Sequence, residues 1–226
     1  MSSKIKIVKP ARSEICPIGY HVVRGHYRIC QSGTVTWVDA HIRRNRGKKT
    51  MYLYENLLHL YWNNKKKYPK LNAIKGFPGY HELDPIIQFW LEYWKSKGVK
   101  FPKGLTPLHI KALIAVESSF RPNVSPKTSS AIGLMQLLKG VNSALRGTKN
   151  IRNNEVKDNY ISVSRKQLED PVVNIAVGTR WLAHKFFLMR NHKDKSLKTT
   201  IRNYHSRDEA GDKYADKVLN YYKTSK

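Results

Sequence analysis

The most informative stretch of the chain is residues 108–137, which read LHIKALIAVESSFRPNVSPKTSSAIGLMQL. Seven of the nine residues from 108 to 116 are apolar, which is typical of a buried helix. Thr106 and Pro107 precede this run, and these residue types favour the N-cap and the first position of a helix. We therefore expect a buried helix that begins at Pro107, with the rest of the fold packed around it.

Glu117 lies at the C-terminal end of this predicted helix. Its spacing from Leu113 and Ile114 places it on the apolar face. Burial disfavours a charged carboxylate, and the negative end of the helix dipole does the same, so we expect a raised pKa. A carboxylic acid that stays protonated near neutral pH is suited to general acid catalysis. The alternative is a helix-end carboxylate that pairs with a cation such as Arg121.

Further along, residues 133–136 combine a glycine, two apolar residues and an amide in the sequence Gly133-Leu134-Met135-Gln136. A glycine allows a ligand to approach the backbone closely. This composition suits the binding of a sugar.

Several motifs follow one another in order through the C-terminal half of the chain. They are Glu117-Ser118-Ser119-Phe120, Pro122-Asn123, Ser125-Pro126, Gly133-Leu134-Met135-Gln136, Leu168-Glu169-Asp170-Pro171, Asn174-Ile175, Gly178, Trp181-Leu182, Tyr204, Tyr214, Val218 and Tyr221. Their order and spacing resemble the soluble lytic transglycosylase (SLT) family, which is related to goose-type lysozyme. The resemblance covers residues 105–222.

This resemblance implies that Glu117 is the catalytic residue of a muramidase that acts on peptidoglycan glycan strands. Glu117 would protonate the oxygen between N-acetylmuramic acid and N-acetylglucosamine, and its carboxylate would then accept the proton of the muramic acid 6-hydroxyl. The product would be a 1,6-anhydro sugar. Because the nucleophile is intramolecular, one glutamate is sufficient, and we expect neither a metal nor a cofactor.

The resemblance also implies a set of substrate-binding residues near the glutamate. They are Ser118, Gly133, Leu134, Met135, Gln136, Tyr204 and His205. Met135 and Gln136 would line the sugar subsites, and Tyr204 would form a hydrogen bond near Glu117. His205 stands where the family usually has asparagine, and two interpretations stay open: it replaces that residue at the site, or it is simply a partly exposed histidine.

A hydrolysing lysozyme of the same fold is the first alternative, because a second carboxylate is able to activate water. The candidates for that carboxylate are Glu155, Asp158, Asp208 and Glu209. Asp170, in contrast, is expected to cap a helix and to be structural. Residues 127–130 make the loop before Ala131 two residues longer than the common family form.

Outside these motifs, we expect a small N-terminal β module over residues 1–50 and a mainly α, lysozyme-like catalytic domain over residues 51–226. Residues 20–27 and 34–42 alternate in polarity around a Ser32-Gly33 turn, which predicts a hairpin. The sequence Val-x-x-His-x-Arg occurs twice, from Val23 and from Val38. The hairpin is either a docking or polyanion-binding element or a basic, exposed strand pair.

The predicted helices of the larger domain have clear boundaries in the pattern. We expect helices over residues 50–67, ending in a lysine run, and over 84–97, then a long helix from Pro171, and shorter ones over 197–205 and 214–222. Gly178 inside the long helix indicates a close helix crossing. Residues 140–165 are polar and are expected to form a surface excursion.

The formal net charge of +26 over 226 residues predicts adsorption to polyanions such as nucleic acid, anionic lipid or a bacterial envelope. A hydrophobic content of 40% excludes a disordered chain. Cys16 and Cys30 are the only cysteines, and a single bridge and two free thiols are equally compatible with them.

The N-terminus shows no standard export signal, and no segment has the length of a transmembrane span. We therefore expect synthesis in the cytoplasm and action in the periplasm or cell wall, after phage lysis or after delivery as an antibacterial effector by a secretion apparatus. The partners implied are a secretion carrier and an acidic immunity protein, with no specific nucleic acid. The alternative from another class is a non-catalytic, basic protein that binds nucleic acid or another polyanion.

Overall fold

The computed structural model describes residues 4–46, 51–124, 126, 129–147 and 160–225. The helices are α1 (Tyr54–Asn64), α2 (Asp84–Ser96), α3 (Pro107–Ser118), α4 (Lys139–Leu145), α5 (Pro171–Leu188), α6 (Leu197–His205) and α7 (Glu209–Thr224). The strands are β1 (Tyr20–Val23), β2 (His26–Ile29), β3 (Val35–Val38), β4 (His41–Arg44), β5 (Met51–Leu53) and β6 (Tyr160–Ser162). The expected mainly α, lysozyme-like fold with a small N-terminal β-hairpin module is confirmed.

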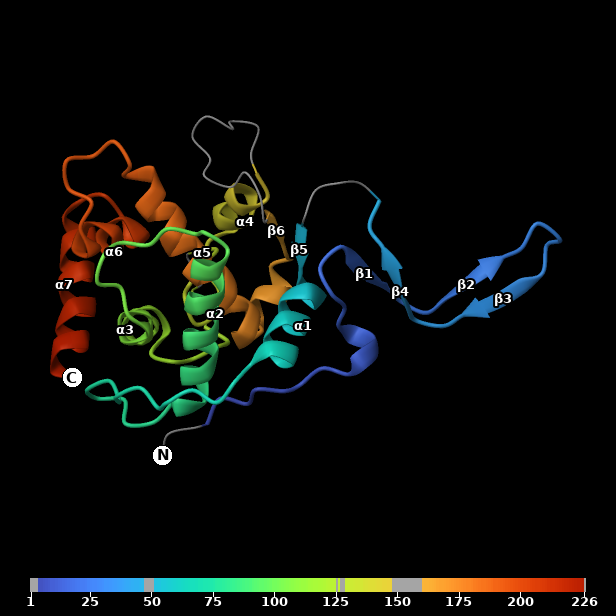
Figure 1. Ribbon diagram of the computed structural model, residues 1–226, viewed down its shortest axis with the longest axis horizontal. Coiled ribbons are helices and arrows are strands. Elements are labelled where there is room, and N and C mark those ends of the chain that lie inside the picture. The colour runs from blue at the N-terminus through green and yellow to red at the C-terminus, as the bar shows by residue number, and fades with distance from the viewer. Residues whose placement is uncertain (1–3, 47–50, 125, 127–128, 148–159, 226) are drawn as a thin grey trace.

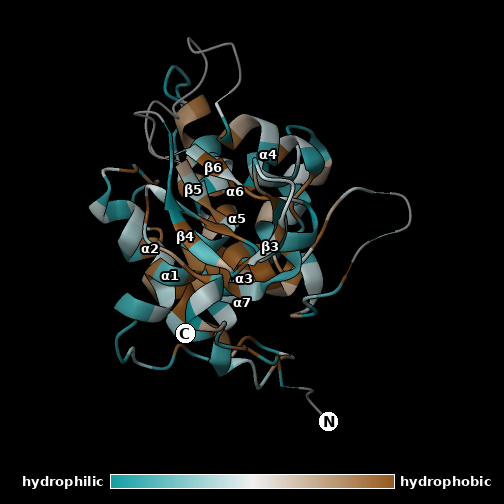
Figure 2. Cartoon of the chain, turned by 90° about the vertical axis from the view of Figure 1, so that its right-hand side faces the viewer, coloured by the Kyte–Doolittle hydropathy of each residue, from teal (hydrophilic) through white to brown (hydrophobic). Residues whose placement is uncertain are grey.

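α3 lies in the centre of the helical body, as its sequence predicts. It begins at Pro107 after the N-cap Thr106, and its apolar residues from 110 to 115 are buried. It packs against α2 on one side and α7 on another. Figure 2 shows the strongest hydrophobic colouring on α3 and α5, which form the middle of the core.

A buried ion pair joins α3 to α2. The Nζ atom of Lys111 lies 2.7 Å from Oδ1 of Asp84, and both side chains are buried almost completely. The second carboxylate oxygen of Asp84 accepts hydrogen bonds from the backbone N–H of Leu71 and from Nδ1 of His81. Removing either partner would leave an uncompensated buried charge, so this pair fixes the position of α3.

The hairpin extends away from the helical body as a two-stranded ribbon (Figure 1). β1 pairs with β4, and β2 pairs with β3. The register is the same in both pairs, because Val23 lies opposite His41 and His26 lies opposite Val38. Each copy of the repeat also makes the same kind of local hydrogen bond. Nδ1 of His26 donates to the Arg24 carbonyl, and Nδ1 of His41 donates to the Asp39 carbonyl. The repeat therefore forms the two equivalent halves of one hairpin.

The segment before the hairpin packs against the helical body. Ile5 and Ile15 are buried in the same hydrophobic core as the helices, and the backbone N–H of Ile5 donates to Glu82. The boundary near residue 50 stays a prediction. Cys16 and Cys30 are both free thiols, and burial raises the pKa of the Cys16 thiol to about 12.

The prediction of a helix over residues 50–67 is wrong at both ends. Residues 51–53 form β5, because they pair in parallel with β6 from much later in the chain. At the other end, the helix stops at Asn64, and Lys65 already has extended backbone angles. The lysine run therefore follows the helix and does not form its last turn.

Three further expectations need correction. The surface excursion over residues 140–165 contains α4 and β6, anchored by buried residues that include Val141 and Ile161. The last helix is longer than predicted, because the Asp208 side chain caps it and it begins at Glu209. Gly178 contacts the side chain of Met135, which lies in a loop, so a helix crossing is not the reason for this glycine.

Among the described residues, no helix combines the length and the hydrophobicity that a transmembrane span requires.

Candidate active site

Glu117 lies in the last turn of α3 and is partly buried. The hydroxyl of Tyr214 donates a hydrogen bond of 2.6 Å to its Oε1 atom. Burial raises the pKa of Glu117 to about 7, although the hydrogen bond from Tyr214 acts in the opposite direction. Arg121 is not its partner, because the Nε atom of Arg121 donates to the Ser118 carbonyl at 3.2 Å. Glu117 therefore has the ionisation behaviour of a general acid near neutral pH.

Two tyrosines and a histidine surround the glutamate. Tyr214 comes from α7 and Tyr204 from α6, and both are buried. Burial, and then the charge of Glu117, raise the pKa of both phenols well above the usual value, so both stay protonated. His205 is exposed and stacks on the Tyr214 ring, with ring centroids 4.7 Å apart and planes 10° apart. His205 therefore covers the residue that holds Glu117.

The loop of residues 131–136 is fixed by Asn174, a buried residue of α5. Its Oδ1 accepts from the Met135 N–H at 2.8 Å, and its Nδ2 donates to the carbonyls of Ile132 and Leu168 at 3.1 and 2.8 Å. The hydroxyl of Tyr204 donates to the Met135 carbonyl at 2.8 Å. Both backbone groups of Met135 are thus held, one from α5 and one from α6.

The two glycines of the motifs are explained by this packing. Gly133 has a φ of +77°, and a Cβ atom there would lie 2.1 Å from the Asn174 side chain. A Cβ atom on Gly178 would lie 2.3 Å from the sulfur of Met135. The space on the Cβ side of Gly133 is therefore filled by protein, and the approach of a ligand to its backbone stays a prediction.

Contacts link some of the expected substrate-binding residues to the glutamate: His205 stacks on Tyr214, which donates to Glu117, and Tyr204 donates to the Met135 carbonyl. Leu134 and Met135 are fully buried, whereas the resemblance implies that Met135 lines a sugar subsite. The Ser118 hydroxyl is also buried and donates to the Ile114 carbonyl. Gln136 is partly buried and donates to the carbonyls of Val124 and Gly133. Leu134, Met135 and Gln136 belong to the loop and Ser118 bonds within α3, whereas His205 is exposed beside Tyr214.

The four candidates for a second carboxylate divide into two pairs. Glu155 and Asp158 lie outside the described residues. Asp208 accepts from the Gly211 N–H and from the Ser206 hydroxyl, and Glu209 forms an exposed ion pair with Lys213. Both of the latter residues have roles at the start of α7. Asp170 caps α5 by accepting from the N–H groups of residues 172 and 173, as expected.

Sequence reasoning did not find two residues of this site. Tyr214 belongs to the motif pattern, but nothing in the sequence links it to Glu117. Asn174 also belongs to the pattern, and the signal that was available is an amide within an otherwise apolar helix. A buried amide needs several hydrogen-bond partners, and here the partners are backbone groups of the loop.

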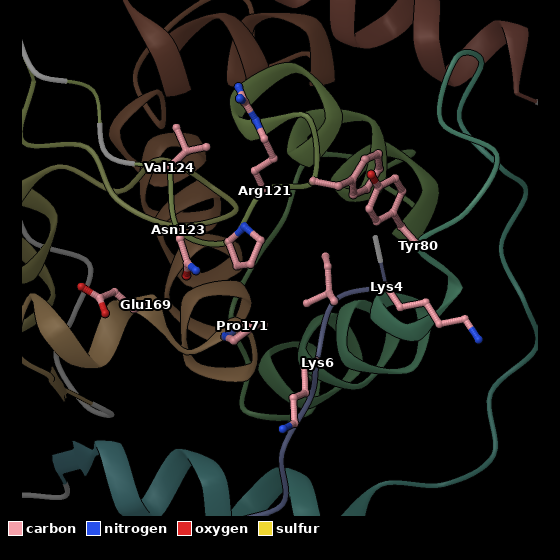
Figure 3. A pocket seen from close by; sticks show the side chains of 11 residues that line it. Lys4, Lys6, Tyr80, Arg121, Asn123, Val124, Glu169 and Pro171 are labelled. Atoms are coloured by element: carbon pink, nitrogen blue, oxygen red, sulfur yellow. The ribbon is translucent and has the colours of Figure 1, made fainter. Parts of the chain in front are cut away.

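A separate hollow of about 690 Å³ opens beside the segment that follows α3 (Figure 3). It is lined by Lys4, Ile5, Lys6, Tyr80, Phe120, Arg121, Pro122, Asn123, Val124, Glu169 and Pro171. Three cations against one carboxylate make the lining basic. Glu117 is not part of the lining, so this hollow does not contain the acid.

The described residues thus form a mainly helical domain built around one partly buried glutamate. Residues 93–205 match the family model of the Transglycosylase SLT domain. The match spans half of the chain, and the chain belongs to this family. It ends at His205, so Tyr214 lies beyond the matched residues.

Among solved structures, the chain is similar to the 70 kDa soluble lytic transglycosylase of Escherichia coli. The sequence identity is 15% and the TM-score is 0.37. The alignment covers 78% of this chain and 30% of that one, so this chain spans less than a third of that protein's length. A comparison with curated proteins finds no match.

Proposed function

We propose that this protein is a lytic transglycosylase that cleaves the bond between N-acetylmuramic acid and N-acetylglucosamine in bacterial peptidoglycan. One observation carries the proposal: Glu117, at the end of the central helix of an SLT domain, has a pKa that burial raises to about 7. A polyanion-binding protein has no use for such a carboxylic acid.

In the first step, protonated Glu117 donates its proton to the glycosidic oxygen, and the bond from that oxygen to the anomeric carbon breaks. In the second step, the 6-hydroxyl oxygen of the muramic acid attacks the anomeric carbon, and its proton passes to the Glu117 carboxylate. Between the two steps the glutamate is charged, and the Tyr214 hydroxyl at 2.6 Å stabilises that charge. The acid is regenerated at the end of the cycle.

Two observations favour the intramolecular nucleophile over water. The causes of the Glu117 pKa shift are burial and the Tyr214 hydroxyl, and neither is a carboxylate. Asp208 and Glu209 are engaged at the start of α7. Among the described candidates for a second carboxylate, both are therefore engaged in other contacts.

We also propose roles for the residues around the glutamate. His205 contacts the sugar or its N-acetyl group, because it is the exposed member of the set and lies against Tyr214. Tyr204 and Met135 hold the loop, and Gln136 contributes the partly exposed edge of the same loop. We assign a packing role to three residues, which are Gly133, Leu134 and Ser118.

The test is the Glu117→Gln variant acting on purified cell-wall sacculi, with Glu92→Gln as a matched control. Glu92 is an exposed carboxylate of α2 that pairs with Lys66. We expect Glu117→Gln to abolish the release of muropeptides and Glu92→Gln to retain it. Full activity of Glu117→Gln would refute the proposal.

Mass spectrometry of the released muropeptides decides the reaction type. We expect 1,6-anhydro products. Products that are heavier by one water would identify a hydrolysing lysozyme, and Asp208→Asn and Glu209→Gln would then be tested for loss of activity.

We place the activity in the bacterial cell wall, reached through phage lysis or through injection as an antibacterial effector. In the second case an acidic immunity protein would suit this basic chain, because complementary charge accelerates association. Expression with and without an exported leader tests the location. We expect toxicity only from the exported form, whereas equal toxicity from the cytoplasm that Glu117→Gln retains would point to nucleic-acid binding.

A further inference from the structure

The outer half of the hairpin carries four exposed apolar side chains. The exposed fractions of Tyr27, Ile29, Val35 and Trp37 are 73%, 73%, 59% and 54%. Tyr27 lies opposite Trp37 and Ile29 lies opposite Val35, and residues two apart on a strand point to the same side. The four side chains therefore form one surface, which we name the apolar hairpin face.

The aromatic part of this face is held in place by its own contacts. The rings of Tyr27 and Trp37 pack edge to face, with centroids 4.9 Å apart and planes 68° apart. Trp37 lies over Gly25, where a Cβ atom would be 2.6 Å from the indole ring. Its Nε1 donates to Asp39 at 2.8 Å, so the indole N–H is already satisfied. The Trp37 and Tyr27 side chains are therefore held in place by contacts within the hairpin.

Positive charge lies on the hairpin outside this face. Residues 20–44 contain four exposed arginines and one aspartate, without lysine or glutamate. The arginines are Arg24, Arg28, Arg43 and Arg44. A hairpin that combines an exposed cluster of tryptophan, tyrosine and aliphatic side chains with exposed arginines matches the interfacial region of a bilayer with anionic headgroups.

Other partners fit these observations less well. Sugars and nucleotide bases stack on flat aromatic platforms, and two rings at 68° to each other do not form one. Ile29 and Val35 offer no hydrogen bond to a glycan, but they lose water favourably in hydrocarbon. Four side chains are also a small area compared with the roughly 800 Å² per partner that a stable protein interface buries.

We infer that the apolar hairpin face is a membrane-docking surface that inserts Tyr27, Ile29, Val35 and Trp37 into the interface of a bilayer containing anionic lipid. The hairpin extends from the helical body, so this contact leaves the body free (Figure 1). The inference does not depend on the proposed cleavage activity.

Co-sedimentation with lipid vesicles tests it, using phosphatidylcholine alone and phosphatidylcholine mixed with phosphatidylglycerol. The test variant is the double substitution Ile29→Thr and Val35→Thr, which keeps β-branched residues in both strands. The matched control is Leu138→Thr, since Leu138 is 50% exposed and lies outside the hairpin. We expect the double variant to bind the mixed vesicles about tenfold more weakly than wild type, and the control to bind like wild type.

Because a chain of charge +26 will adsorb to anionic vesicles by charge alone, insertion needs a second measurement. Spin-labelled lipid should quench part of the tryptophan fluorescence of wild type. Trp37→Phe, which keeps an aromatic ring on the face, should still bind but lose that quenching, because the other four tryptophans lie outside the hairpin: Trp90 and Trp94 are buried, and Trp62 and Trp181 are partly buried on α1 and α5.

Three results would overturn the inference. The first is equal vesicle binding by wild type and the double variant, and the second is the absence of quenching in wild type. The third is binding to purified sacculi, and not to vesicles, that the double variant loses, which would identify a wall-binding hairpin. Glu117→Gln should bind vesicles like wild type, so failure of the cleavage proposal would leave this test unaffected.

Discussion

Replacing Tyr214 by phenylalanine removes the hydroxyl that donates to Glu117 and should raise the pKa of the glutamate. A buried hydrogen bond to a charged group contributes about 1.5–3 kcal/mol, and about 1.4 kcal/mol of preference for the charged form corresponds to about one pH unit. Because this bond stabilises the carboxylate, its loss should raise the Glu117 pKa from about 7 by about one pH unit or more.

The assay is the pH dependence of kcat/KM on soluble glycan fragments. A general acid works only when it is protonated, so activity should fall as the pH rises through the Glu117 pKa. In Tyr214→Phe this fall should occur about one pH unit higher than in wild type. Tyr221→Phe is the control, because Tyr221 lies on the same helix and its ring packs against Phe77.

A direct titration of the Glu117 carboxyl carbon by NMR, with Glu117→Gln to assign the signal, should give the same shift without any substrate. If the alkaline limb and the titration stayed unchanged in Tyr214→Phe, or moved to lower pH, the hydrogen bond would not control the acid. The reasoning from the structure would then be refuted.

Three further outcomes are expected from denaturation measurements. Glu117→Gln should match the stability of wild type near pH 4 and exceed it increasingly up to about pH 7, by about 3 kcal/mol at most. The reason is that in wild type the unfolded chain loses the Glu117 proton at lower pH than the folded protein does, so the free energy of unfolding of wild type falls over this range. A pH-independent difference would contradict the raised pKa. Gly178→Ala should lower the free energy of unfolding by about 1–3 kcal/mol, because the new Cβ atom clashes with Met135. Gly140→Ala is the control and should not lower it, because a Cβ atom there meets nothing within 4 Å. Equal effects of the two substitutions would exclude the clash. Tyr204→Phe should cost about 1–3 kcal/mol by leaving a buried carbonyl unsatisfied, and an unchanged unfolding midpoint would show that this bond is dispensable.

The central helix and its acid could be predicted from sequence because their signal is local. The apolar run from 108 to 116 has one interpretation, and Thr106 and Pro107 mark where the helix begins. The raised pKa of Glu117 also follows from its place on the apolar face, and burial is its main cause. The hairpin was predictable for the same reason, because its alternation and its turn lie within one short segment.

The contacts around the acid could not be predicted, because they depend on residues that are distant in sequence. The motif indicates that Met135 lines a ligand site, but the backbone of Met135 forms hydrogen bonds with Asn174 and Tyr204, and its side chain is buried in the core. A glycine at position 178 indicates that another part of the chain packs closely against the helix, but the sequence does not show that this part is Met135. Tyr214 meets Glu117 only because α7 packs against α3.

The pairing of β5 with β6 has a consequence for the order in which the chain folds during synthesis. Residues 51–53 emerge from the ribosome long before their partners at 160–162, so β5 waits unpaired while most of the helical body is still being made. The hairpin, in contrast, is complete once Arg44 has emerged. α7 follows the other described helices in the chain, and it carries the hydroxyl that holds Glu117. The acid therefore acquires its partner only after α7 has been made.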